Sequence, residues 1–367
     1  MGGAVKVASI WIIAILLAVA ALSWWSKVLR RGEVVPGEYN AQSEEHANMT
    51  VEQLRIDVSR LALPQGRMVG TAGHESARSY LLDRLQKMGV SGYADTGLEL
   101  PYEVNGNRYT NLIGKVAGAN PALAPALLAA HYDTCGPFPG ADDNAAAIAI
   151  LLALAERWSH APLERTVVFA FFDAEEPPSF LGPEMGSIHF YHHQRTTPIH
   201  CAVVLDLVGH DVPMPGLEDL VFVTGMESNA QFAEIIESSG GGAPIKIVPA
   251  LNRYIGDLSD HHIFRINERP YLFFSCAHWE HYHQPTDTHE KLNYEKMAAL
   301  GEYLAELTEK VCGAALDAPF EGYDSTPAEL RLMRRAIGPL VESMGFALNN
   351  RRDIDRVVMA IASQFGL

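Results

Sequence analysis

Short apolar runs alternate with segments of helical periodicity through the middle of the chain. The runs are too short for helices, and their nearly unbroken hydrophobicity is typical of strands that are buried on both faces of a mostly parallel sheet. Five runs have this character, namely residues 125–130, 166–172, 201–205, 220–224 and 271–276. Helical segments are indicated at residues 145–158, 185–194, 229–238 and 289–311. The alternation predicts an α/β protein, a sandwich with a mostly parallel central sheet.

The segments before and after this region have patterns of their own. Residues 75–88 repeat apolar side chains at helical spacing, which predicts a helix with one buried face. Residues 102–116 are β-prone on both sides of the turn-forming pair Asn105-Gly106 and predict a hairpin. After a proline-containing linker, two helix-like segments without potential metal ligands follow at residues 327–344 and 352–364.

These patterns divide the chain into four parts. We expect an apolar N-terminal segment (residues 1–31), an exposed linker (32–50), a large catalytic-type domain (51–312) and a C-terminal helical extension (313–367). The linker prediction is based on Gly, Pro, Ser, Asn and acidic residues without apolar periodicity.

Composition narrows the choice of function. The chain has 367 residues, of which 48% are hydrophobic, enough for a packed core. Its formal net charge of -16 disfavours a nucleic-acid partner, because a phosphate backbone would be repelled by most of the surface. The four cysteines form no CxxC pair, so we interpret them as small hydrophobic residues: Cys135, Cys201, Cys276 and Cys312.

Potential metal ligands follow three of the predicted strands. His131 and Asp133 come at the end of the first run, Glu175 and Glu176 after the second, and Asp206 after the third. Further candidates stand in two loops, with Asp142 and Asp143 before the alanine-rich helix and His283 in a late loop. In open α/β sheets such sites gather at the carboxyl ends of strands, so the coincidence predicts a common metal site. A lone histidine or aspartate in any one of these places is more often structural.

Six short motifs together resemble the co-catalytic zinc aminopeptidases, a group that includes glutaminyl cyclases and glutamate carboxypeptidases. The motifs are HYD at 131, PGADDN at 139, FDAEE at 172, LDLVG at 205, SDHHIF at 259 and YHQPTDT at 282. They occur in the family's order, and the resemblance covers residues from about 60 to 312. It implies a three-layer α/β/α sandwich of the phosphorylase/hydrolase-like fold and a zinc-dependent exopeptidase that hydrolyses peptide bonds at chain ends.

The resemblance also implies a role for each candidate. Asp143 would bridge two zinc ions, with His131 and Asp206 on the first ion and Glu176 and His283 on the second. Such a nitrogen and oxygen ligand set fits zinc and also admits cobalt or manganese. The Asp143–Asn144 peptide bond is expected to be cis.

Three catalytic roles remain. Asp133 would orient the imidazole of His131. Glu175 would act as the general base that takes the proton of the attacking water. Tyr282 would help to bind the oxyanion, although a pocket wall is an equal interpretation of this tyrosine.

Several alternatives stay open at this point. A glutaminyl cyclase would use one zinc ion and close a ring without water. A carboxypeptidase would need a basic group for the substrate's terminal carboxylate, for which Arg253 and Arg265 are available. A metal-free binding ectodomain is disfavoured, because none of the five ligands is missing.

Residues 7–25 are uncharged and almost wholly apolar, long enough in helical form to span a bilayer. We expect a membrane anchor with an extracytoplasmic catalytic domain. The small residues at 18–20 allow instead a cleaved signal peptide and a secreted protein. Lys27, Arg30 and Arg31 follow the span, and the positive-inside rule would place the body in the cytoplasm.

Overall fold

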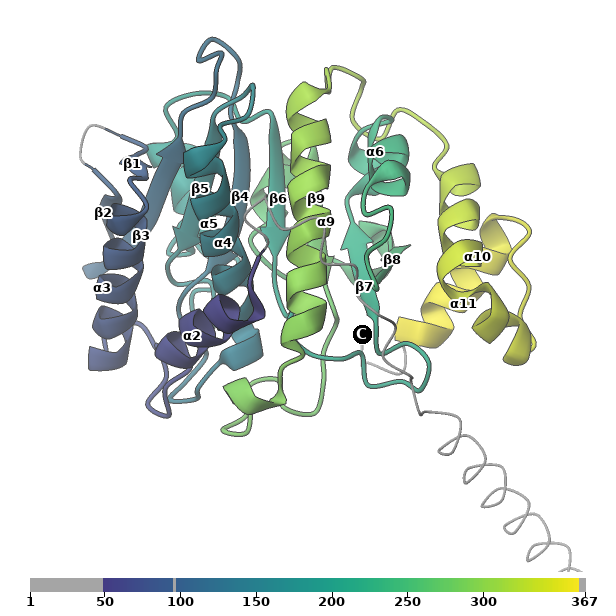
Figure 1. Cartoon of the computed structure of the whole chain (residues 1–367), viewed down its shortest axis with the longest axis horizontal. Helices are drawn as coiled ribbons and strands as arrows, with labels where there is room; N and C mark the ends of the chain where they lie inside the picture. The colour runs from purple at the N-terminus through teal and green to yellow at the C-terminus, as the bar shows by residue number, and fades with distance from the viewer. Residues whose placement is uncertain (1–48, 95–96, 363–367) are drawn as a thin grey trace, which may run out of the picture. The chain divides into compact units, whose positions relative to one another are not determined.

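A nine-stranded sheet runs through the protein (Figure 1). The computed structural model describes residues 49–94 and 97–362. The strands are β1 (Ser91–Gly92), β2 (Glu99–Val104), β3 (Asn107–Val116), β4 (Ala126–His131), β5 (Val167–Phe172), β6 (Cys201–Leu205), β7 (Leu220–Thr224), β8 (Lys246–Pro249) and β9 (Tyr271–Ser275). Their order across the sheet is β1-β3-β5-β4-β6-β9-β7-β8, and β2 pairs with β3.

The centre of the sheet is parallel, and its flanks are mixed. β4 pairs in parallel with β5 and β6, and β6 pairs in parallel with β9. On one side β3 runs antiparallel to β5, and on the other β7 runs antiparallel to β9. The sheet is therefore less parallel than the apolar runs predict, because pairing direction is not encoded in the hydrophobicity of a buried strand.

Alternate residues of the central strands point into two separate apolar layers. On β4, Leu128 belongs to the core with the helices of one face, and its neighbour Leu127 belongs to the core of the other face. The first face is covered by α2 (Val51–Leu61), α3 (Ala72–Lys87), α4 (Ala146–His160) and α9 (Tyr294–Gly313). The second face packs on Phe190 and Phe264, from the segments around α5 (Gly186–His189) and α8 (His262–Ile266). This arrangement is the predicted three-layer α/β/α sandwich.

The C-terminal helices pack beside the β7–β8 end of the sheet (Figure 1). They are α10 (Thr326–Ser343) and α11 (Arg351–Ala362). Buried side chains of α10, including Met333 and Ile337, belong to the same apolar core as α4 and the sheet. The C-terminal helices are thus continuous with the main core.

Most predicted elements occur within a few residues of their expected bounds, but two predicted helices differ and several elements, including β8, were not predicted. The helix expected at 289–311 is broken, because Asn293 accepts a hydrogen bond from the backbone N–H of Lys296 and caps α9. The helix expected at 229–238 is shorter, as α6 (Phe232–Ser238). Helix α2 was not predicted at all, although its buried face, which includes Leu54 and Val58, packs on α4 and α9. No described helix is long and apolar enough to cross a membrane, and the predicted anchor at residues 7–25 lies outside the described residues.

The packing of α10 on the main core can be used to test whether the C-terminal extension unfolds together with the main domain. Ile337 is 1% exposed, so Ile337→Ala should lower the free energy of unfolding by about 2–5 kcal/mol, in a single transition. Met359→Ala is the control in the same extension, because Met359 is 56% exposed and should change stability by about 0.5 kcal/mol or less. Urea unfolding followed by tryptophan fluorescence and circular dichroism measures both. A separate early transition in Ile337→Ala would show that the extension unfolds independently.

Candidate metal centre

The candidate ligands meet at one edge of the sheet because three parallel strands end there. His131 is the last residue of β4, Glu175 and Glu176 follow β5, and Asp206 follows β6. The carboxyl ends of neighbouring parallel strands share an edge, so these side chains lie together. Two loops add Asp143 and His283.

The carboxylate of Asp143 lies between two histidines. Its Oδ1 is 3.2 Å from Nε2 of His131, and its Oδ2 is 3.1 Å from Nε2 of His283. On one side, Oδ1 of Asp206 is 3.6 Å from the same nitrogen of His131. On the other side, Oε2 of Glu176 is 3.0 Å from Nε2 of His283. The five predicted ligands therefore form two adjoining groups that share one carboxylate.

We call these groups the first position (His131, Asp143 and Asp206) and the second position (Asp143, Glu176 and His283). Two atoms that bind one tetrahedral zinc at 2.0–2.2 Å are about 3.4 Å apart. The distances from each histidine nitrogen to the carboxylate oxygens of its group, 3.0–3.6 Å, are close to this value. Several of these buried atoms have no hydrogen-bond partner: both ring nitrogens of His131, Oε1 of Glu176, Oδ1 of Asp206 and Nε2 of His283. Orphaned acceptors facing one another need a cation, so the site fits zinc.

Asp133 organises the turn that carries the two glutamates. Its Oδ1 accepts a hydrogen bond from the backbone N–H of Glu175 and its Oδ2 one from that of Glu176, both at 3.1 Å. The same Oδ1 lies 3.4 Å from Nδ1 of His131. The turn is irregular, since Ala174 has a positive φ of 54°. Asp133 thus touches His131 as expected and also fixes the glutamates, which the sequence did not indicate.

The loop around Asp143 is held from both sides. The Asp143–Asn144 peptide bond is cis, as expected. The carboxylate of Asp287 accepts hydrogen bonds from the backbone N–H groups of Asp142 and Asp143, at 2.9 and 3.2 Å. The side chain of Asp142 makes hydrogen bonds to the backbone N–H of Gly209 and to Nδ1 of His210, so it belongs to neither position.

Arg67 holds the same loop from beneath, and sequence analysis missed it. The guanidinium is 1% exposed and donates only to backbone carbonyls. Its acceptors are Tyr132 (2.9 Å), Leu61 (3.1 Å), Pro139 (2.7 Å), Gly140 (3.0 Å) and Asp143 (3.3 Å). A planar group with five donors can tie three chain segments together in this way. No short motif marks such a residue.

The electrostatics of the centre are those of a buried acidic cluster. Burial raises the pKa of the Glu175 carboxyl well above its usual range, and the charges of Asp206 and Glu176 add to this against the opposite effect of His131. Burial, together with the charge of Asp143, raises the pKa of Glu176 to about 8. Burial alone would lower the pKa of His283, but the adjacent carboxylates of Asp143 and Glu176 raise it to about 10. Both positions therefore favour positive charge.

A cavity of about 150 Å³ opens onto the centre. Its polar lining contains the carboxylates of both positions and Glu175, and its apolar lining is Pro177, Phe180, Leu207, Leu258 and Phe273. Tyr282 lines it too, with its ring stacked on His283 at a centroid distance of 3.8 Å. The described lining contains no lysine or arginine.

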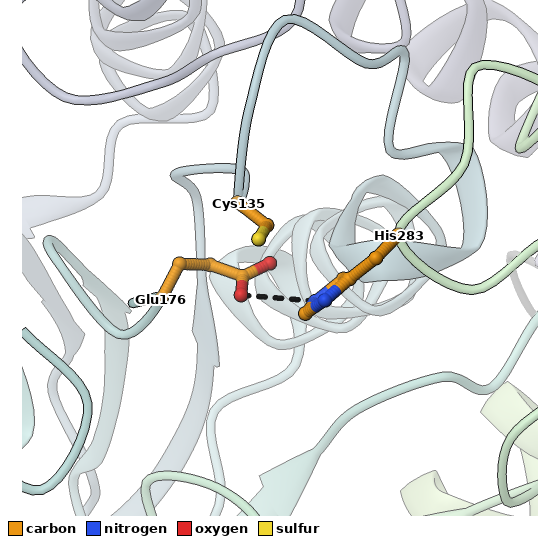
Figure 2. Close-up of side chains that lie close together, drawn as sticks. All are labelled: Cys135, Glu176 and His283. Atoms are coloured by element: carbon orange, nitrogen blue, oxygen red, sulfur yellow. Dashed lines mark ion pairs between the residues drawn. The ribbon is translucent and has the colours of Figure 1, made fainter. Parts of the chain in front are cut away.

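Three other residues near the centre differ from expectation. Asp260 was not singled out, yet it is buried with both carboxylate oxygens unpartnered, and burial raises its pKa to about 7. His261 follows Asp260 in the SDHHIF motif, but its Nε2 faces Asn252 at 3.2 Å and not the centre. Cys135 was interpreted as a small hydrophobic residue, but it lies beside Glu176 and His283 (Figure 2).

An α/β/α sandwich with paired acidic and histidine ligands at its strand ends defines a class, the metal-dependent hydrolases. Residues 111–308, more than half of the chain, match Peptidase family M28. The protein belongs to this family and is a zinc metallopeptidase.

Several relatives and solved structures are similar to this chain. The uncharacterized protein YfbL of Escherichia coli is 29% identical over 241 residues, which are 57% of this chain and 72% of YfbL. A vacuolar membrane protease of Vanderwaltozyma polyspora is 31% identical over 156 residues, 42% of this chain but only 16% of that protein. A Zn-dependent exopeptidase of Parabacteroides distasonis has the same fold, with a TM-score of 0.57 and 19% identity over 71% of this chain and 97% of that chain. A glutaminyl cyclase of Tannerella forsythia also has this fold, with a TM-score of 0.58 and 19% identity. The match covers 71% of this chain and 99% of the cyclase chain.

Arg67 offers a test of how the loop supports the centre. Arg67→Lys keeps the charge but loses most of the five carbonyl contacts, so zinc affinity should fall by about 10- to 100-fold. Arg165→Lys is a matched control, because Arg165 also donates to three carbonyls, those of Ala124, Cys312 and Ala314, away from the metal centre. It should lower stability without changing zinc affinity. Competition titration with a zinc indicator measures the zinc affinity of both variants. An equal loss of zinc affinity in the two would mean that Arg67 acts only through general stability.

Proposed function

We propose that the protein is an aminopeptidase that removes terminal residues from peptides with a dinuclear zinc centre. The observation that carries this proposal is the Asp143 carboxylate, with one oxygen facing each of two histidines. Zinc in both positions would supply Lewis-acid activation of a water and of the scissile carbonyl. His131 and Asp206 would hold the first ion, and Glu176 and His283 the second.

Glu175 is proposed as the general base. Its carboxylate lines the cavity, its Oε1 has no hydrogen-bond partner, and its Oε2 lies 3.9 Å from the nearest ligand nitrogen, farther than the other carboxylates. A carboxylate beside the two positions that is not needed as a ligand can take a proton from water and return it to the departing amine. Glu175 would thus move protons while its neighbours hold ions.

Two further residues have supporting roles. Asp133 would orient His131 and fix the turn that aims the two glutamates in different directions. Tyr282 lines the cavity beside His283, where its hydroxyl can donate a hydrogen bond to an oxyanion.

The cavity lining favours an aminopeptidase over a carboxypeptidase. A terminal carboxylate needs a basic partner, and the described lining has none. The two arginines available from the sequence are engaged elsewhere: Arg253 pairs with Asp355 at 3.0 Å and Arg265 with Asp257 at 2.5 Å. Carboxylate oxygens instead accept hydrogen bonds from an amino group, and the apolar walls around Phe180 and Phe273 suit an apolar side chain.

The glutaminyl cyclase alternative shares this fold, as the Tannerella forsythia enzyme shows. Two complete positions favour hydrolysis, since such a cyclase would use one zinc ion. We further propose that residues 7–25 anchor the catalytic domain outside the cytoplasm, or that their cleavage releases it. The partial match to a vacuolar membrane protease supports a membrane link.

The proposal is tested by metal analysis and a substrate panel. Purified protein should hold two zinc ions per chain and hydrolyse aminoacyl chromogenic amides with apolar residues, but not substrates blocked at the amino group. Cyclisation of a peptide with N-terminal glutamine is measured in parallel. One zinc per chain with ring closure and no amide hydrolysis would replace the aminopeptidase by the cyclase.

The two adjacent glutamates make a sharper prediction. Glu175→Gln keeps the size of the side chain but cannot accept the water's proton, so kcat should fall by about 10²- to 10⁴-fold with metal content intact. Glu176→Gln should instead weaken zinc at the second position, because an amide oxygen is a poorer ligand than a carboxylate. Zinc stoichiometry and rates are measured on both variants. Full activity in Glu175→Gln, or equal zinc loss in both, would reverse the assignment.

A further inference from the structure

Cys135 stands beside the second position on the loop that follows β4. Its Sγ and ligand atoms of Glu176 and His283 all lie within 4.8 Å of one another. Figure 2 shows the sulfur above the Glu176 carboxylate, which forms an ion pair with His283 at 3.0 Å. The other three cysteines are buried in the apolar core, so Cys135 is the partly exposed one.

The neighbours of Cys135 have unused ligand capacity. Glu176 is 5% exposed, and its Oε1 has no hydrogen-bond partner. Nε2 of His283 is buried without one as well. These orphaned atoms point to a bound cation independently of the cysteine, and the cysteine lies at the same spot.

The Cys135 sulfur lies on a different side of the second position from the cavity through which a substrate would enter. Asp143, Glu176 and His283 line the cavity described above, and they also line a small hollow of about 10 Å³ together with Cys135 and Gln284. A sulfur and a nitrogen that bind one tetrahedral zinc are about 3.6 Å apart, so a shift of about 1 Å in the sulfur is sufficient for coordination. The cavity side of the second position stays open for water and substrate.

We propose that Cys135 is a fourth protein ligand of the second position. This proposal rests on the dinuclear centre of the proposed function and deepens it. The Cys135 thiol releases its proton to solvent as the sulfur–metal bond forms, with no change of oxidation state. The first position then has only nitrogen and oxygen ligands, and the second has a thiolate in addition. Because thiolates select soft metals, the two positions differ in metal preference: zinc and cadmium favour the second, whereas manganese is excluded from it more strongly than from the first.

The test uses the full chain, stripped of metal with a chelator and titrated with Cd²⁺. A thiolate–cadmium bond has an ultraviolet charge-transfer absorption that nitrogen and oxygen ligands do not produce. We expect this absorption to rise with cadmium binding in the wild type and to be absent in Cys135→Ser, whose cadmium affinity should fall by about tenfold or more. Cys312→Ser is the matched control and should retain both, because Cys312 is buried on α9.

Thiol labelling of the wild type gives a second readout that needs no variant. Cys135 should react with a thiol reagent in the metal-free protein and be protected by two equivalents of zinc, with the modified residue located by mass spectrometry. Two cadmium ions per chain without charge-transfer absorption, or with absorption that persists in Cys135→Ser, would overturn the cysteine assignment alone. Failure of the wild type to bind cadmium would overturn the proposed metal centre itself, and the cysteine assignment with it.

Discussion

The structure depends on a group of carboxylates held close together where three parallel strands end. Asp143, Glu175, Glu176 and Asp206 are all nearly buried, and their nearest basic partners are two histidines. An uncompensated buried charge costs several kcal/mol, and mutual repulsion adds to that cost. Bound cations at this edge of the sheet would therefore lower the free energy of the folded state. The two positions are the places where the carboxylates are arranged to bind them.

The residues that enforce this geometry mostly do not face the first or the second position. Asp287 and Arg67 act on the backbone of the loop that carries Asp143, one through N–H groups and the other through carbonyls. Asp133 does the same for the turn after β5. Fixing backbone groups instead of ligand side chains leaves the ligand atoms free of competing hydrogen bonds, so they remain available to a metal.

The ends of apolar runs predicted three of the candidate ligands at one edge of the sheet, namely His131, Glu176 and Asp206. Asp143 and His283 stand in loops, and their roles came from the resemblance to a known family. A run of apolar residues places the end of each strand within a residue or two, so His131 and Asp206 could be expected at one edge. The supporting contacts were not predictable in the same way. Arg67 donates hydrogen bonds to backbone carbonyls of residues more than 70 positions away in the chain. Every residue has a backbone carbonyl, so the amino-acid sequence does not show which ones accept. The spacing of Cys135 matches no cysteine motif, and only the folded loop brings it beside Glu176.

The same fold serves exopeptidases and glutaminyl cyclases, so the sandwich alone does not decide the reaction. Four carboxylates line the cavity, and the described lining contains no lysine or arginine to offset them. Mutual repulsion of these buried carboxylates would be relieved by bound cations, so the lining is suited to a metal centre. Under the proposed function, Glu175 would take the proton of the attacking water.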